Sequence, residues 1–316
     1  MTNEPSMPNK GVFDAVVSTN KQIRGRFFRL GLEFTGAGAK AFSKARPGQF
    51  TQLDLSKVAL PPAEKIPQDL LDSIHRKILL RRPFSFSDVT ANGDKTVVEI
   101  LYSVVGPATL RMSTLANGNS VSVIGPLGNG FSIPADKKTV LLIVGGMGAG
   151  PLIHLAKALT TDCPTTEVLA FAGAKTAKEL PFEKLLDKLA QEVGFSLAEF
   201  ARYGVQSFVA TDDGSAGFAG AVTDCFSDWL KHNKIPSADA VIYACGPEAM
   251  LAKVAGIARD RRIDCQISME RMMACGIGLC QSCPVECKLN GSNETIYKLC
   301  CKDGPVFDSK EVVFGS

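Results

Sequence analysis

Residues 139–151, TVLLIVGGMGAGP, decide the fold of the middle part of the chain. An unbroken apolar run of this kind is typical of a parallel strand that is buried on both faces. The glycines after it allow a tight turn, and Pro151 suits the first position of the helix that PLIHLAKAL continues. The stretch therefore predicts a strand, a glycine turn and a helix in succession.

Strand and helix patterns alternate downstream of this stretch. We expect strands at EVLAFAG (167–173), SFVAT (207–211) and AVIYAC (240–245), and helices at PFEKLLDKLAQEV (181–193), AVTDCFSDWLKH (221–232) and PEAMLAKVAGIARD (247–260). Such alternation predicts a doubly wound α/β domain with a parallel sheet, over 136–265.

Upstream, the pattern consists of short strands. FDAVVS, FFRLGLEF, QFTQLDL, VVEILYSVV and SVSVIG are separated by Gly, Pro and Asn turns, which favours an antiparallel β-barrel over 8–135. Residues 57–81 interrupt this rhythm with prolines and charges. We expect a surface excursion there, with a short helix at 68–79, and a small third domain at 266–316.

The bulk composition is that of an ordinary globular protein. Of 316 residues, 45% are hydrophobic, and 35 Lys and Arg against 32 Asp and Glu give a net charge of +3. This charge balance gives no electrostatic reason to expect binding to nucleic acid or to an anionic membrane. The N-terminal residues lack the apolar core of a secretory signal, and residues 139–153 are too short and glycine-rich to span a bilayer. We therefore expect a cytoplasmic location.

Two glycine-containing turns are candidates for binding a nucleotide. The turn with Gly145, Gly146, Gly148 and Gly150 would let a pyrophosphate approach the backbone at a helix N-terminus. The turn Cys245-Gly246-Pro247 also lies at a strand end, where ligands bind in this class of sheet. Each motif has a plain alternative: a tight turn without a ligand, and a cysteine that is simply buried.

The barrel half carries a candidate flavin motif, Arg82-Pro83-Phe84-Ser85. An arginine can pair with a diphosphate, an aromatic ring can cover a flavin, and a hydroxyl can bond a ring nitrogen. The alternative is a surface arginine beside a strand. A glycine-dense turn, GPLGNGF (125–131), follows before the domain boundary.

The order of these motifs resembles that of the ferredoxin-reductase superfamily. The resemblance covers about residues 10–265 and implies FAD on the barrel and a nicotinamide nucleotide on the α/β domain.

Six of the ten cysteines lie between Cys275 and Cys301. The spacing Cys275-x4-Cys280-x2-Cys283 with a distant fourth cysteine is that of a plant-type [2Fe–2S] site, and Gly276 and Gly278 would let the loop fold round it. Zinc sites more usually pair two C-x2-C knuckles, and a second knuckle is missing. Zinc and unliganded core cysteines are the alternatives.

Spacing alone leaves the fourth ligand open between Cys287, Cys300 and Cys301. Cys287 follows Cys283 too closely to reach far round a cluster. Adjacent residues of an extended segment point opposite ways, so only one of Cys300 and Cys301 is expected to face it.

The tail, MACGIGLCQSC (273–283) with CKDGPVF (301–307), resembles that of the electron-transfer subunits of class 1B dihydroorotate dehydrogenases. The resemblance implies Cys301 as the fourth ligand and leaves Cys300 to packing. It also implies FAD contacts at Leu101-Tyr102-Ser103 and Ala108-Thr109. Ser103 stands where that family has an arginine, and Ala108 where it has a glycine.

This resemblance implies a division of labour. A separate FMN-containing catalytic subunit would oxidise dihydroorotate, and electrons would pass through [2Fe–2S] and FAD to NAD+, in a heterotetramer of two plus two subunits. The chain has no room for an FMN barrel of about 250 residues. The runner-up is a flavin and iron–sulfur subunit of a NAD(P)H:ferredoxin oxidoreductase, a sulfide dehydrogenase or a hydrogenase. A non-enzymatic redox sensor or zinc-stabilised binding module is the alternative from another class.

The choice between NAD and NADP is open from the residues. AFAGAKTAKEL (170–180) offers no well-placed acidic side chain, while Lys175 could attract a phosphate. NAD follows from the resemblance alone.

Overall fold

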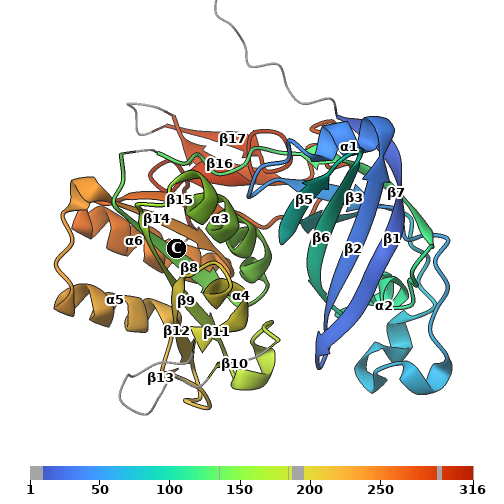
Figure 1. Cartoon of the computed structure of the whole chain (residues 1–316), viewed down its shortest axis with the longest axis horizontal. Coiled ribbons are helices and arrows are strands. Elements are labelled where there is room, and N and C mark those ends of the chain that lie inside the picture. Colours follow the sequence, from blue (N-terminus) through green and yellow to red (C-terminus); the bar gives the residue numbers. More distant parts are fainter. Residues whose placement is uncertain (1–9, 135, 184, 187–195, 290–293, 316) are drawn as a thin grey trace, which may run out of the picture.

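A computed structural model describes residues 10–134, 136–183, 185–186, 196–289 and 294–315 of the chain. Two lobes stand side by side, and the C-terminal segment lies across the top where they meet (Figure 1). No helix among the described residues is long and apolar enough to cross a membrane.

The first lobe is an antiparallel half-barrel. Its strands are β1 (Gly11–Arg24), β2 (Phe27–Thr35), β3 (Phe50–Leu53), β4 (Arg82–Ser85), β5 (Asp88–Asn92), β6 (Lys95–Ser103) and β7 (Ser120–Leu127). They lie in the order β4-β3-β7-β1-β2-β6-β5, with antiparallel pairing throughout. Short helices α1 (Gly36–Phe42) and α2 (Pro107–Met112) flank the sheet. The prediction of an antiparallel barrel-like sheet is confirmed.

Alternating side chains build the core of the half-barrel. Ala15 and Val17 on β1 and Leu30 and Leu32 on β2 are fully buried, whereas their neighbours on β1 face outward. Phe42 of α1 stacks on a strand phenylalanine at 4.0 Å between ring centroids and closes one end of this core. The period of two along each strand therefore sets which face is covered.

The excursion at 57–81 contains no α-helix. Two 3₁₀ turns, η1 (Ala63–Lys65) and η2 (Gln68–Ser73), are its only helical elements, so the helix expected at 68–79 is wrong beyond Ser73. Leu70 and Ile78 are buried, but Leu79 is 84% exposed and Leu71 is also exposed. Without a continuous apolar face to pack, so short a helix is not stable.

The second lobe is a mostly parallel sheet covered on both faces. Its strands are β8 (Thr139–Gly145), β9 (Glu167–Ala174), β12 (Gln206–Thr211), β13 (Phe218–Ala219), β14 (Ala240–Cys245), β15 (Asp264–Ser268) and β18 (Val306–Asp308). Their order is β13-β12-β9-β8-β14-β15-β18, and only β18 is antiparallel to its neighbour. The predicted doubly wound sheet is confirmed.

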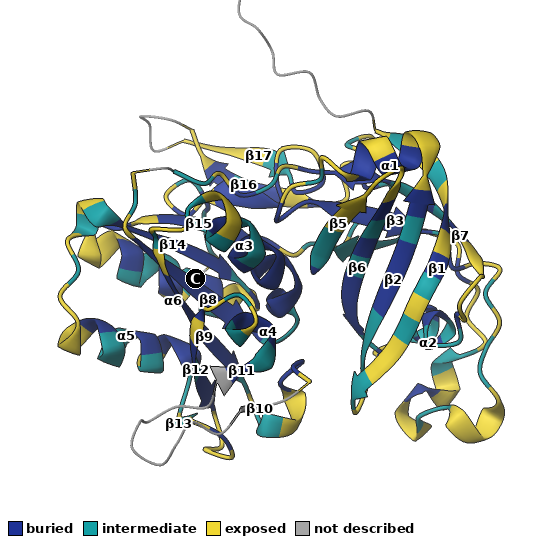
Figure 2. Cartoon of the chain, viewed as in Figure 1, coloured by how far each residue is buried: buried dark blue, intermediate teal, exposed yellow. Residues whose placement is uncertain are grey.

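Successive residues of β8 serve opposite faces. Val140, Leu142 and Val144 pack with helix α3 (Ala149–Asp162). Leu141 and Ile143 pack with α5 (Val222–His232) and α6 (Glu248–Arg261) on the other side. Figure 2 shows this central strand buried. The unbroken apolar run in the sequence is the result of this double covering.

The helix expected at 181–193 is not formed where the chain is described. Leu180, Pro181 and Phe182 are all buried, in a stretch that has no regular secondary structure. Next come β10 (Leu185–Leu186), paired with β11 (Ser196–Leu197), and the short helix α4 (Ala198–Ala201). Residues 187–195 lie outside the described part.

The C-terminal segment is fixed to both lobes. Strands β16 (Pro284–Lys288) and β17 (Thr295–Leu299) pair with each other, while β18 extends the sheet of the second lobe beside β15. From the first lobe, Asn129 donates its backbone N–H to the carbonyl oxygen of Gly304 at 2.6 Å and its side-chain amide to that of Asp303 at 2.9 Å. The glycine-dense turn at 125–131 therefore anchors the cysteine segment.

Candidate cofactor cleft and cysteine centre

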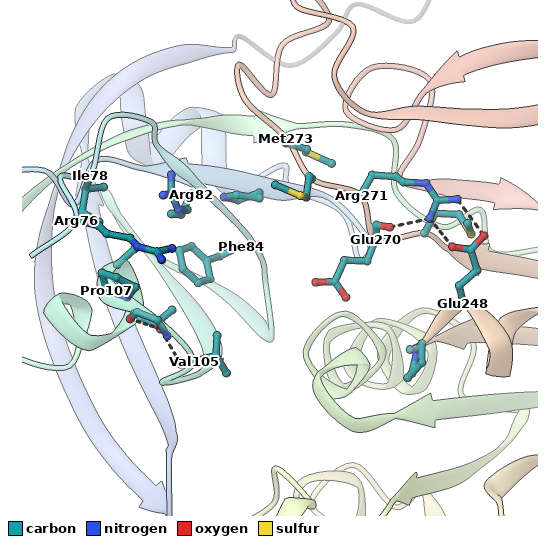
Figure 3. A pocket seen from close by; sticks show the side chains of 18 of the residues that line it. Arg76, Ile78, Arg82, Phe84, Val105, Pro107, Glu248, Glu270, Arg271 and Met273 are labelled. Carbon is teal, nitrogen blue, oxygen red and sulfur yellow. Dashed lines mark hydrogen bonds and ion pairs between the residues drawn. The ribbon is translucent and has the colours of Figure 1, made fainter. Parts of the chain in front are cut away.

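A cleft between the lobes consists of two cavities, of about 800 Å³ and about 590 Å³, that share walls. The shared wall includes Phe84 and Thr109 from the half-barrel, Gly246 from the second lobe, and Met269 and Arg271 from the segment leading to the cysteines. In Figure 3, Arg76, Arg82 and Phe84 face Glu248, Glu270 and Arg271 across this space. All three parts of the chain therefore contribute to one site.

The nucleotide side of the cleft is formed by two glycine turns that pack against each other. Strands β8 and β14 are neighbours, so the turns that follow them meet at one edge of the sheet. A Cβ atom on Gly148 would overlap the carbonyl of Cys245, and one on Gly145 would lie 2.7 Å from the Met250 sulfur. Gly146 has φ +49° and open space around it. Several of these glycines are therefore required by the contact between the turns, while Gly146 leaves room at the cleft.

The flavin-motif residues line the opposite side. Tyr102 is buried, which raises the pKa of its phenol, and its hydroxyl donates to Asn20 at 3.0 Å. Thr109 accepts backbone N–H bonds from Val105 and Gly106 at 2.9 and 3.2 Å. These bonds fix the wall against which a ring system could lie.

Each residue predicted from the sequence to bind a cofactor lines one or both cavities. The set is Arg82, Pro83, Phe84, Ser85, Leu101, Tyr102, Ser103, Ala108, Thr109, Gly145, Gly146, Gly148, Gly150, Cys245, Gly246 and Pro247. The fold brings them together from elements more than a hundred residues apart. Their roles toward particular cofactors remain predictions.

The cleft also contains charged residues that sequence reasoning missed. Arg76 and Lys77 of the excursion line it beside Arg82, whose guanidinium donates to the carbonyl of Leu80 at 2.7 Å. On the facing wall, Arg271 forms a two-pronged ion pair with Glu248 at 2.9 and 3.1 Å. The only sequence signal for Arg76 was the missing arginine at Ser103, which left a place for another cation.

Four cysteines come together in two pairs. Cys280 lies beside Cys275, and Cys301 lies beside Cys283. Backbone N–H groups of Ile277 and Cys280 point at the Cys275 sulfur at 3.5 and 3.4 Å. The N–H of Cys301 points at the Cys283 sulfur at 3.4 Å. Such N–H groups stabilise the negative charge of thiolate ligands.

Cys280 and Cys301 differ in how readily they ionise. Hydrogen bonds from Ser282 and from the loop backbone lower the pKa of Cys280 to about 6, which favours the thiolate form that binds metal. Burial and the neighbouring Cys283 raise the pKa of Cys301 to about 12. A metal bound there must displace that proton.

The other two nearby cysteines are engaged differently. The thiol of Cys300 donates to the carbonyl of Met269 at 3.3 Å, and burial raises its pKa to about 12. Cys287 lies on β16 and is completely buried in the apolar core. The adjacent Cys300 and Cys301 thus have different partners.

The donors fit a binuclear iron–sulfur centre. Two neighbouring pairs of cysteines agree with two ligands for each of two irons. The loop's Gly276 and Gly278 have φ +70° and +89°, and a Cβ on Gly276 would overlap the buried Gln52 amide, which has no partner. The assignment of the four cysteines as ligands remains a prediction.

Two segments of the chain match models of known protein families. Residues 270–313 match the iron–sulfur cluster binding domain of dihydroorotate dehydrogenase B, and residues 142–256 match the oxidoreductase NAD-binding domain.

Curated relatives extend the match to nearly the whole chain. The electron transfer subunit of dihydroorotate dehydrogenase B (NAD(+)) from Caldanaerobacter subterraneus subsp. tengcongensis is 31% identical over 300 residues, 95% of this chain and 98% of the relative. The subunit of the same name from Geobacillus kaustophilus is 36% identical over 285 residues, 89% of this chain and 92% of the relative.

A solved structure has the same overall arrangement. The NADH-dependent reduced ferredoxin–NADP oxidoreductase superposes with a TM-score of 0.70 at 25% identity, covering 95% of this chain and 90% of that one.

Proposed function

Because the chain belongs to the family of dihydroorotate dehydrogenase B electron transfer subunits, we propose that it carries electrons from a catalytic partner subunit to NAD+. The cofactors are FAD, a [2Fe–2S] cluster and NAD. When bound, FAD exchanges hydride with nicotinamide and single electrons with iron–sulfur, so it links the two kinds of carrier.

One observation supports this most directly. Residues Ser268, Met269, Glu270, Arg271 and Met273 form part of the cleft wall, and the chain reaches Cys275 two residues later. The flavin cleft and the cysteine centre are therefore next to each other, as an electron relay needs.

We assign the half-barrel wall to FAD. Arg82 would pair with the diphosphate, Phe84 would cover the flavin, and Ser85 would bond a ring nitrogen. Arg76 and Lys77 add positive charge at the same wall, which compensates for Ser103 in place of the family's arginine. Leu101, Tyr102, Ala108 and Thr109 complete the wall.

The nucleotide would enter against the two glycine turns, with its pyrophosphate near Gly146 at the start of α3. Cys275, Cys280, Cys283 and Cys301 would hold the cluster. The chain serves as one of two kinds of subunit in a cytoplasmic heterotetramer of two plus two, its partner an FMN-containing dihydroorotate dehydrogenase. We propose three domains, 8–135, 136–265 and 266–316, and strand β15 extends from the second into the third as far as Ser268.

The decisive experiment compares the chain alone with the chain plus that partner. Alone, the FAD-loaded protein should reduce artificial dyes with NADH and leave dihydroorotate unchanged. With the partner, dihydroorotate should drive NAD+ reduction. Dihydroorotate turnover without the partner would contradict the proposed division of labour.

A second candidate follows from the structural likeness to the ferredoxin–NADP oxidoreductase. It is a subunit that exchanges electrons between NAD(P)H and ferredoxin. Ferredoxin-dependent reduction of NAD+ or NADP+ by the purified chain, with no response to dihydroorotate in the presence of the partner, would favour it.

A further inference from the structure

Gln52 is a polar side chain buried without a partner. It lies on β3 and is 0% exposed, and neither its amide nitrogen nor its amide oxygen has a hydrogen-bond partner. Leaving an amide unpaired in the interior costs free energy. A residue in this situation calls for a group that is bound in the working protein.

The direction of the side chain follows from the alternation along β3. Leu53 belongs to the core of the half-barrel, and Thr51 bonds the carbonyl of Ile124 on β7 at 2.8 Å. Phe50, on the opposite face, shares a core with Cys283 and Cys301. Gln52 lies on the same face of the strand as Phe50, so it faces the cysteine segment.

The amide lies directly against the cluster loop. A Cβ atom added to Gly276 would overlap the Gln52 amide, and Gly276 immediately follows Cys275. The left-handed φ of +70° and the contact with this amide both require glycine at position 276. Gln52 lines neither cavity of the cleft, so the flavin is not its partner.

We propose that Gln52 is a positioning residue for the iron–sulfur centre, and this rests on the proposed function. Its amide N–H donates to a sulfur at the Cys275 end of the cluster. A hydrogen bond to cluster sulfur stabilises the extra negative charge of the reduced state and raises the reduction potential. A side chain of the flavin-binding lobe would thereby set the potential of the centre that exchanges electrons with the flavin.

The test compares Gln52→Met and Gln52→Leu with a matched control, Gln49→Leu. Gln49 precedes the same strand and is 3% exposed, but its amide donates to the carbonyl of Gly128 at 2.8 Å and accepts from the N–H of Arg46 at 2.9 Å. All variants are prepared anaerobically with FAD and iron. Their cluster potentials, EPR spectra and rates of iron loss to a chelator are then measured.

In both Gln52 variants the cluster potential should become more negative, and iron should be lost about tenfold faster, as for other residues that support metal ligands. The flavin potential should stay unchanged. Gln49→Leu should lower the stability of the protein without moving the cluster potential or the EPR spectrum.

A second readout uses protein stripped of iron. There the Gln52 amide is unpaired, so Gln52→Leu should unfold at the same urea concentration as wild type or a higher one, and only the loaded protein should be weakened. Equal cluster potentials and equal iron loss in wild type and both Gln52 variants would overturn the inference. A wild-type protein that binds no iron would instead overturn the proposed function.

Discussion

Arg29 on β2 and Glu199 on α4 form an ion pair that joins the two lobes, with 2.6 Å between the guanidinium and carboxylate. Glu199 is only 3% exposed, and the same oxygen accepts the backbone N–H of Glu183 at 2.7 Å. Glu99 of the half-barrel lies 3.9 Å from the guanidinium. Both partners of the pair are thus largely withdrawn from water, and the pair connects the half-barrel to the second lobe.

Replacing Arg29 by leucine should lower the free energy of unfolding by about 3–5 kcal/mol, because Glu199 would be left buried without its counter-charge. Urea unfolding of the FAD-loaded protein measures this. Lys95→Ala is the control, since its pair with Glu33 is exposed and should contribute little to stability. Equal stability of Arg29→Leu and Lys95→Ala would show that the interlobe pair is unimportant.

Replacing Cys301 by serine should diminish or reshape the EPR signal of the cluster, because Cys301 lies beside Cys283 and is proposed as the fourth ligand. Electron transfer from the partner should stop, while NADH-to-dye activity through FAD should largely survive. Cys300→Ser and Cys287→Ser are the matched controls and should keep the signal. A lost signal in Cys300→Ser with a retained one in Cys301→Ser would reverse the assignment.

Arg82→Ala should loosen FAD roughly ten- to a hundredfold, because a charge-assisted hydrogen bond to the diphosphate contributes about 1.5–3 kcal/mol. Flavin fluorescence on dilution measures the affinity. The adjacent Arg81 is a close control: its guanidinium bonds Ser122 at 2.8 and 3.0 Å, and it lines neither cavity. Unchanged FAD affinity in Arg82→Ala would show that this arginine does not bind the diphosphate.

Arg76→Ala should also loosen FAD, because this arginine supplies charge at the wall where Ser103 supplies none. The effect should shrink at high salt, since Arg76 is exposed and its attraction for the diphosphate is screened. Lys65→Ala, in the same excursion but away from the cleft lining, serves as the comparison. Identical FAD affinities for the two variants would exclude a role of the excursion in binding.

Protonation of His154 should make the folded protein less stable as the pH falls. Burial in α3 lowers the pKa of this imidazole to about 4, while nearby Asp88 raises it and Lys157 lowers it. The unfolded chain takes up the proton near pH 6.5 and the folded protein only near pH 4, so stability decreases as pH falls through that window. Between pH 7 and pH 5 the loss should be about 2 kcal/mol.

Urea unfolding at the two pH values tests this. His154→Leu should remove most of the difference, whereas His75→Gln, at an exposed position, should keep it. An unchanged pH dependence in His154→Leu would mean that other groups cause the acid sensitivity.

The sequence predicts well those strands and turns that depend on residues close together along the chain. The period of two in the first lobe and the buried run at 139–145 identify both sheets, because each pattern reflects the covering of one strand. The described start of the segment at 181–193 is not the helix that its charged and apolar residues predict, since Leu180 and Phe182 insert into the core. Burial of these two side chains depends on the rest of the fold and cannot be read locally.

In the candidate site, too, local motifs were predictable and residues positioned by distant contacts were not. Glycine turns, the Arg-Pro-Phe-Ser motif and the cysteine spacing are local, and the fold brings them to one place. Gln52, Arg76 and Arg271 acquire their positions only from contacts between segments far apart in the chain. A glutamine on a short strand has no distinguishing pattern until Gly276 is packed against it.

Strand β18 makes the cysteine segment a structural part of the second lobe, since it pairs with β15 through Gln266, Ile267 and Ser268. Cutting the chain after Ser268 to obtain a simple two-domain flavin reductase would therefore leave β15 as an open sheet edge. It would also uncover Ile267, which is buried in the intact protein. Exposed edges of this kind recruit strands from other molecules. Such a truncated protein should be prone to self-association. Polar substitutions along β15 would be needed to keep it monomeric.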